Sequence, residues 1–225
     1  QNVTNDNAGP LILLFMNDRY FINGGTTDEN PLLIATVSDE SGINTVGTGI
    51  GHDLTAILDD NLDNPFILND YYESDVNTFE SGKIIFPLVG LPEGKHRIVV
   101  RAWDVHNNSS EAAIDFAVVP AGTFVIENPL CFPNPFSEYT DVTYSHNQQG
   151  KMLKTSLHIY TITGKPVVTL EQERQDFGSR ATPVRWDGRD SDGNKVAAGM
   201  FIYKIISSTA DGLSATLQGK LIYNK

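Results

Sequence analysis

The fold is decided by a stretch in the first half of the chain, His96-Arg97-Ile98-Val99-Val100-Arg101-Ala102-Trp103. Its apolar and polar side chains alternate imperfectly, which is typical of a β-strand that buries one face. The residues just before it, Leu91-Pro92-Glu93-Gly94-Lys95, carry Pro and Gly at turn spacing. A period of two, and not the 3.6 of a helix, therefore governs this part of the sequence.

Runs of the same kind recur on both sides of this stretch, and the segments between them are rich in Gly, Pro, Asn and Asp. In the first half we expect further strands at Leu11–Met16, Leu32–Val37, Leu54–Leu58, Lys83–Val89 and Ala113–Val119. In the second half we expect them at Asp141–His146, Leu153–Ile162, Lys165–Leu170, Thr182–Trp186, Gly199–Ser207 and Ala215–Ile222. No amphipathic helix longer than two turns is predicted. The pattern indicates an all-β protein of two tandem immunoglobulin-like β-sandwich domains.

Charge is distributed unevenly along the 225 residues, whose net charge is −12. Residues 1–120 hold 18 acidic and 5 basic side chains, whereas residues 121–225 hold 10 and 11. Such asymmetry favours two units with different surroundings. The sequence Pro120-Ala121-Gly122-Thr123 separates two apolar runs, so we place the domain boundary there, giving domains 1–120 and 121–225.

Composition excludes several classes of protein. The acidic net charge is opposite to that of a nucleic-acid binder, and no run of about 20 apolar residues could cross a bilayer as a helix. The single cysteine, Cys131, has no partner for an internal disulfide. The chain starts without Met or a signal peptide, so we expect it to be a processed or excised piece of a longer protein.

A catalytic or metal centre finds little support. Cys131 beside one of five scattered histidines could suggest a cysteine peptidase, but it lies in the extended stretch Pro129–Pro133, and we expect a small buried side chain instead. The acidic run Asp59–Asn64 could hold calcium, although its spacing favours a solvated turn. Asp190–Asn194 predicts a hairpin turn. Trp103 and Trp186 could form part of a sugar-stacking platform, but core packing is favoured. We therefore predict no catalytic residues, no metal site and no cofactor.

Several ordered motifs in the first half carry a resemblance to a known family. They are Gly49–Asp59, Asn69-Asp70-Tyr71-Tyr72-Glu73, Phe79-Glu80-Ser81-Gly82-Lys83, Gly94-Lys95-His96 and Ala102–Ala112. They look like the region that follows the peptidase domain in type IX secretion sortases, which are gingipain-like cysteine peptidases.

The second half opens with Phe132-Pro133-Asn134-Pro135-Phe136 and continues through Ile159–Lys165, Trp186–Asp190 and Gly193–Tyr203. It is similar to flagellar hook-capping and type IX C-terminal domains. Such modules commonly carry Gly-Val-Tyr or Gly-Ile-Tyr where this chain reads Gly199-Met200-Phe201, a change that leaves the strand prediction intact.

The resemblance implies a function for the whole parent protein. Sortases of this family cleave the C-terminal secretion signal from type IX cargo proteins at the bacterial cell surface and join the cargo to anionic lipopolysaccharide. Their catalytic Cys and His lie in a caspase-like domain upstream, so Cys131 does not inherit that role. The family's C-terminal module is thought to dock to an outer-membrane β-barrel shuttle protein, which implies a peripheral location on the outer membrane of a Gram-negative bacterium.

Carried onto this sequence, the docking surface falls on the last two strands, Gly199–Tyr203 and Leu217–Lys225. A C-terminal strand can leave an edge open to a partner, and the near-neutral charge of residues 121–225 suits contact with a partner or an anionic surface. An ordinary closing strand of the sandwich remains the alternative. The predicted partner-binding residues are Gly199, Met200, Phe201, Tyr203, Leu221, Tyr223 and Lys225.

Two other functions stay open at this point. The chain could be a stand-alone adhesion, scaffold or glycan-binding β-sandwich protein with no peptidase attached. It could also be a cargo protein whose second half is a removable sorting signal.

Overall fold

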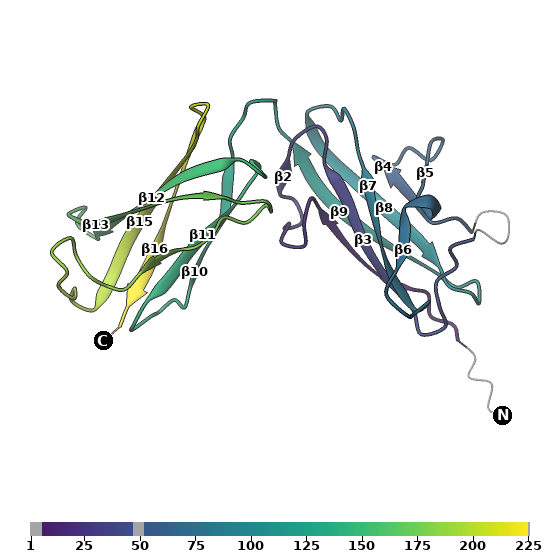
Figure 1. The fold of residues 1–225 in the computed structure, drawn as a ribbon, viewed down its shortest axis with the longest axis horizontal. Coiled ribbons are helices and arrows are strands. Elements are labelled where there is room, and N and C mark those ends of the chain that lie inside the picture. Colours follow the sequence, from purple (N-terminus) through teal and green to yellow (C-terminus); the bar gives the residue numbers. More distant parts are fainter. Residues whose placement is uncertain (1–5, 47–51, 225) are drawn as a thin grey trace. The chain divides into compact units, whose positions relative to one another are not determined.

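The computed structural model describes residues 6–46 and 52–224. The chain divides into two compact units, Gln1–Ala121 and Gly122–Lys225, which we call unit 1 and unit 2 (Figure 1). Each contains two β-sheets, so the prediction of an all-β chain with tandem immunoglobulin-like sandwiches is confirmed. Within the described ranges, no helix has both the length and the apolar character needed to cross a membrane.

Unit 1 contains a four-stranded and a five-stranded sheet. The first has the order β1 (Leu11–Met16), β3 (Leu32–Ser38), β7 (Ser81–Pro87) and β6 (Tyr72–Ser74), with all pairs antiparallel. The second has the order β2 (Thr26–Thr27), β9 (Ser109–Val118), β8 (Gly94–Trp103), β4 (Thr55–Leu58) and β5 (Phe66–Ile67). A short 3-10 helix, η1 (Asn69–Tyr71), leads into β6.

The core of unit 1 is largely aliphatic. Along β8 the side chains of Ile98, Val100 and Ala102 are fully buried, while Arg97 and Arg101 on the opposite face are exposed. Leu33 and Ile84 are buried in the same cluster from the other sheet. The apolar side chains that alternate with polar ones in residues 96–103 are therefore the side chains that β8 contributes to the core.

Unit 2 pairs a three-stranded with a four-stranded sheet. The first has the order β10 (Ile126–Phe132), β11 (Thr140–His146) and β14 (Val184–Trp186). The second has the order β13 (Pro166–Gln175), β12 (Met152–Thr161), β15 (Gly199–Thr209) and β16 (Ser214–Tyr223), all antiparallel.

The core of unit 2 is aromatic and contains hydroxyl groups. Trp186 is 1% exposed and lies edge-on to both Phe136 and Phe201, with ring centroids 5.4 and 5.2 Å away. The buried Tyr144 hydroxyl donates to Ser207 Oγ at 2.8 Å and lies 2.7 Å from Thr155 Oγ1. Buried hydroxyls need such partners, so this network fixes β11, β12 and β15 in one arrangement.

Candidate docking surface

The two strands predicted to meet a partner form a long hairpin, and β16 is the edge strand of its sheet (Figure 1). The register is regular from Ser208↔Ser214 to Gly199↔Tyr223. Because a regular register keeps successive side chains on opposite faces, the hairpin has an inner face toward the core and an outer face toward solvent.

The structure divides the predicted partner-binding residues between these faces. Four of them are buried and belong to the core cluster: Phe201, Tyr203, Leu221 and Tyr223. Gly199 and Met200 are exposed, Met200 by 46%. Lys225 lies outside the described residues. In the folded unit the four buried side chains pack in the core and are not accessible to a partner. Gly199 and Met200 are accessible.

Packing explains the burial of the three aromatic residues. Phe201 contacts the Trp186 ring, and the Tyr223 ring lies 5.1 Å from that of Phe136. The Tyr203 ring occupies the space where a side chain at Gly219 would stand, so only glycine fits opposite it. The two strands predicted to dock are thus positioned by aromatic packing in the core of unit 2.

The outer face of the hairpin carries residues that the sequence prediction missed. Met200 pairs across the strands with Ile222, which is 36% exposed, and Ile202 pairs with Lys220. The next basic side chain is Lys204. Neither lysine makes an ion pair with any residue in 6–46 or 52–224. We call Met200, Ile202, Lys204, Lys220 and Ile222 the outer patch. It is an apolar surface with free positive charge, and the two lysines are the signal in the sequence that could have pointed to this face.

The C-terminal end of the β16 edge is covered by the Pro-Asn-Pro-Phe motif. Asn134 Oδ1 accepts a hydrogen bond from the backbone N–H of Ile222 at 2.9 Å, and the Phe136 N–H donates to the Ile222 carbonyl at 3.0 Å. The Asn224 N–H donates to the Phe136 carbonyl at 2.7 Å. The motif that carried the family resemblance therefore acts as a lid on one end of the edge strand.

The rest of the β16 edge is open. Since Ile222 and Asn224 direct their backbone groups away from β15, alternation directs those of Thr216, Gln218 and Lys220 the same way. No hydrogen bond from another described residue reaches these outward groups. Such an edge can accept a strand from another chain.

Cys131 lies beneath the hairpin. Burial raises the pKa of its thiol, and a hydrogen bond with Tyr203 offsets this only in part. The same burial, together with Cys131, raises the pKa of the Tyr203 hydroxyl. A nucleophilic cysteine needs a lowered pKa. Cys131 packs against the core of unit 2 but is only half-buried, where the sequence predicted a buried side chain.

Several acidic side chains accept hydrogen bonds within turns and loops. Asp59 accepts hydrogen bonds from the Arg97 N–H and from His96, and Asp190 Oδ1 accepts from the N–H groups of Asp192 and Asn194 in a tight turn. Asp104, which lies near Asp6 and His106, is fully buried and accepts from the N–H groups of His106 and Asn108. These carboxylates hold loops in place.

A crystal structure of dimeric latent PorU from Porphyromonas gingivalis matches 99% of this chain at 31% identity, with a TM-score of 0.51. The chain resembles the C-terminal region of a type IX secretion sortase. It spans 21% of the PorU chain. The resemblance inferred from the motifs is thus confirmed by a match over nearly the whole length.

Other solved structures match the chain at lower identity. Fibronectin(III)-like modules of Clostridium thermocellum CbhA match 95% of this chain and 93% of their own at 11% identity, with a TM-score of 0.34. The FN1–FN3 domains of chicken CNTN1 match 91% of this chain and 66% of their own at 12% identity, with a TM-score of 0.32. No family model and no curated protein matched the chain.

Proposed function

We propose that this chain is the non-catalytic C-terminal part of a surface sortase and that unit 2 docks the enzyme to an outer-membrane β-barrel partner. The parent enzyme would remove C-terminal secretion signals from type IX cargo and attach the cargo to anionic lipopolysaccharide. The chain would then lie at the cell surface, peripheral to the outer membrane. The observation that carries the proposal is the 31% identity to PorU over 99% of this chain.

The form of the β15–β16 hairpin supports docking through unit 2. The Met200–Ile222 pair exposes apolar side chains on the outer face of an antiparallel sheet, where polar residues are usual. Lys204 and Lys220 beside it add positive charge suited to acidic loops of a partner. Unit 1, with 18 acidic and 5 basic residues before position 121, suits an anionic surface less well.

The test is capture of an identified partner by the whole 225-residue chain. The immobilised chain is incubated with detergent-solubilised outer membranes of a Bacteroidota bacterium, and bound proteins are identified by mass spectrometry. We expect one β-barrel protein to be recovered. The double variant Met200→Glu/Ile222→Glu should reduce its recovery about tenfold or more, the usual effect of losing a central apolar contact.

A matched control lies on the same hairpin. Ser208→Glu/Ser214→Glu places the same two charges on another cross-strand pair of the outer face, away from the outer patch. This variant should recover the β-barrel as the unmodified chain does. Equal losses in the two variants, or recovery of no β-barrel by folded protein, would refute docking through the outer patch.

A further inference from the structure

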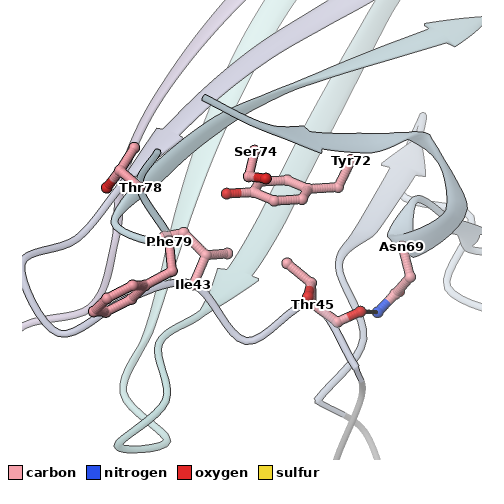
Figure 2. A pocket seen from close by; sticks show the side chains of 7 residues that line it. All are labelled: Ile43, Thr45, Asn69, Tyr72, Ser74, Thr78 and Phe79. Carbon is pink, nitrogen blue, oxygen red and sulfur yellow. Dashed lines mark hydrogen bonds between the residues drawn. The ribbon is translucent and has the colours of Figure 1, made fainter. Parts of the chain in front are cut away.

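A pocket of about 340 Å³ lies at the edge of the four-stranded sheet of unit 1 (Figure 2). Two of its lining residues, Tyr72 and Ser74, belong to the edge strand β6, and Asn69 comes from η1. Thr78 belongs to the turn between β6 and β7, and Thr45 lies beyond β3. In Figure 2 the Tyr72 ring and Ser74 lie on one side and Thr45 on the other.

The pocket is lined mainly by neutral hydrogen-bonding groups. Four hydroxyls, those of Thr45, Tyr72, Ser74 and Thr78, and the amide of Asn69 line it. No lining side chain is charged at neutral pH, and burial and the nearby Asp75 raise the pKa of Tyr72 further above its ordinary value of 10.0. Hydroxyls both donate and accept hydrogen bonds, so they complement the hydroxyls of a ligand.

Two aromatic rings are held in place by glycines. A side chain at Gly82 would meet Tyr72 Cζ and Oη within 2.5 Å, and one at Gly42 would meet the Phe79 ring at 2.5 Å. Each ring therefore occupies space that a side chain at the neighbouring glycine position would fill. Phe79 is 67% exposed at the pocket and offers an apolar ring surface beside the hydroxyls.

The hydrogen-bonding groups of the pocket differ in how far a ligand can reach them. The Tyr72 hydroxyl oxygen is buried and makes no hydrogen bond with any residue that the structure describes, so it is closed to a ligand as well. Asn69 Oδ1 accepts a hydrogen bond from the Leu54 N–H at 3.1 Å, and its Nδ2 donates to the Thr45 carbonyl at 2.9 Å. Ser74, in contrast, is exposed, and its hydroxyl can both donate to and accept from a ligand.

We propose that this pocket binds a neutral polyhydroxylated ligand the size of one sugar ring, with the exposed Ser74 hydroxyl bonded to a ligand hydroxyl and the exposed Phe79 ring packed against the ligand. The volume is at the lower end of the range for small-molecule sites, roughly 300–1,000 Å³. The acidic character of unit 1 disfavours an anionic ligand. The site is independent of docking through unit 2.

The test is titration of the isotope-labelled chain with D-glucose, D-galactose, D-mannose and N-acetyl-D-glucosamine, followed by amide NMR shifts. At least one sugar should give saturable shifts at Tyr72, Ser74 and Phe79. Ser74→Ala removes an exposed hydroxyl of the pocket and should weaken binding roughly 5- to 10-fold, the effect of one net hydrogen bond. Phe79→Ala, which removes the exposed ring, should also weaken binding.

Tyr71→Phe is the matched control. Tyr71 neighbours Tyr72 but packs edge-on against Phe86 at 4.8 Å and does not line the pocket, so this variant should bind as the unmodified chain does. Sodium sulfate is titrated as an anionic probe. The proposal is overturned if no sugar shifts the pocket amides, if sulfate binds there in preference, or if folded Ser74→Ala and Phe79→Ala both keep full affinity.

Discussion

Unit 1 fills the space between its sheets with aliphatic side chains such as Leu33 and Ile84, whereas unit 2 uses Trp186, Tyr144 and Tyr203. Aliphatic cores tolerate rearrangement if volume is kept, but aromatic rings and buried hydroxyls need particular neighbours. In unit 2 some of those neighbours, Phe201, Ser207 and Gly219, belong to the hairpin that carries the outer patch. The comparison shows that the core of unit 2 and its proposed docking surface share the same hairpin.

The largest effect should follow from Trp186→Ala. Loss of a fully buried indole leaves a cavity against Phe136 and Phe201 and should destabilise unit 2 by about 3–5 kcal/mol. Since Trp103 is then the sole tryptophan, its fluorescence during urea unfolding reports on unit 1, while circular dichroism reports on both units. We expect an early transition in the dichroism and an unchanged fluorescence midpoint.

The reciprocal variant, Leu33→Ala, should lower the fluorescence midpoint of Trp103 in the otherwise unmodified chain. If Trp186→Ala lowered that midpoint too, the two cores would not act separately, and the contrast drawn between them would fail.

A smaller effect is expected from Tyr144→Phe. The change removes a hydroxyl bonded to Thr155 and Ser207 and should cost about 1–2 kcal/mol by urea unfolding, because two buried hydroxyls lose a partner. The triple variant Tyr144→Phe/Thr155→Val/Ser207→Ala removes the whole network and should recover much of that loss. If the triple variant were less stable than Tyr144→Phe, the hydrogen bonds of the network would make a net contribution to stability. The cost of leaving buried hydroxyls unpaired would then not explain the loss in Tyr144→Phe.

The smallest effect concerns the pH dependence of unit 1. The buried His96 lies between two acceptors, with Nδ1 2.7 Å from Asp59 Oδ2 and Nε2 2.8 Å from the Pro92 carbonyl, so both nitrogens donate only when the ring is protonated. Burial lowers its pKa, but the hydrogen bonds to Pro92 and Asp59 prevail and the pKa is raised. Because the folded state binds the proton more tightly, this stabilisation is complete below about pH 6.5 and is lost as the pH rises through the folded pKa.

Urea unfolding at pH 5.5 and pH 8.5 measures this contribution. The loss of stability caused by His96→Gln should be larger at pH 5.5 than at pH 8.5. The control His158→Gln, on the outer face of unit 2, should show no comparable difference. An equal loss at both pH values would mean that His96 acts by packing against Phe116 alone.

Strand positions followed from the sequence where an apolar run was bounded by turn residues, and β1 begins and ends at the predicted residues, Leu11–Met16. Strand β10 was missed because Asn128 has a positive φ of 49° and the register shifts between Glu127 and Leu130, which together break the alternation. Pro129 inside it also argues against a strand. An irregular strand that is held by pairing with its neighbour does not show the alternation of apolar and polar residues from which strands are predicted.

The candidate sites were predictable only in part. The hairpin was found, but its sequence from Gly199 to Tyr203 is apolar on both faces, so periodicity could not tell which residues face solvent. The pocket of unit 1 was not found, because it depends on the space left at Gly82, far along the chain from Thr45. A close approach of this kind is visible only once the strands are paired.

The lid that Asn134 and Phe136 form over the end of β16 has a consequence for stoichiometry. An incoming strand can pair with the backbone of Thr216, Gln218 and Lys220 and must then stop, since the next outward groups are already bonded. A short edge of this kind accommodates one brief segment and gives no template for open-ended stacking. Unit 2 is thereby suited to a complex with one partner segment per chain.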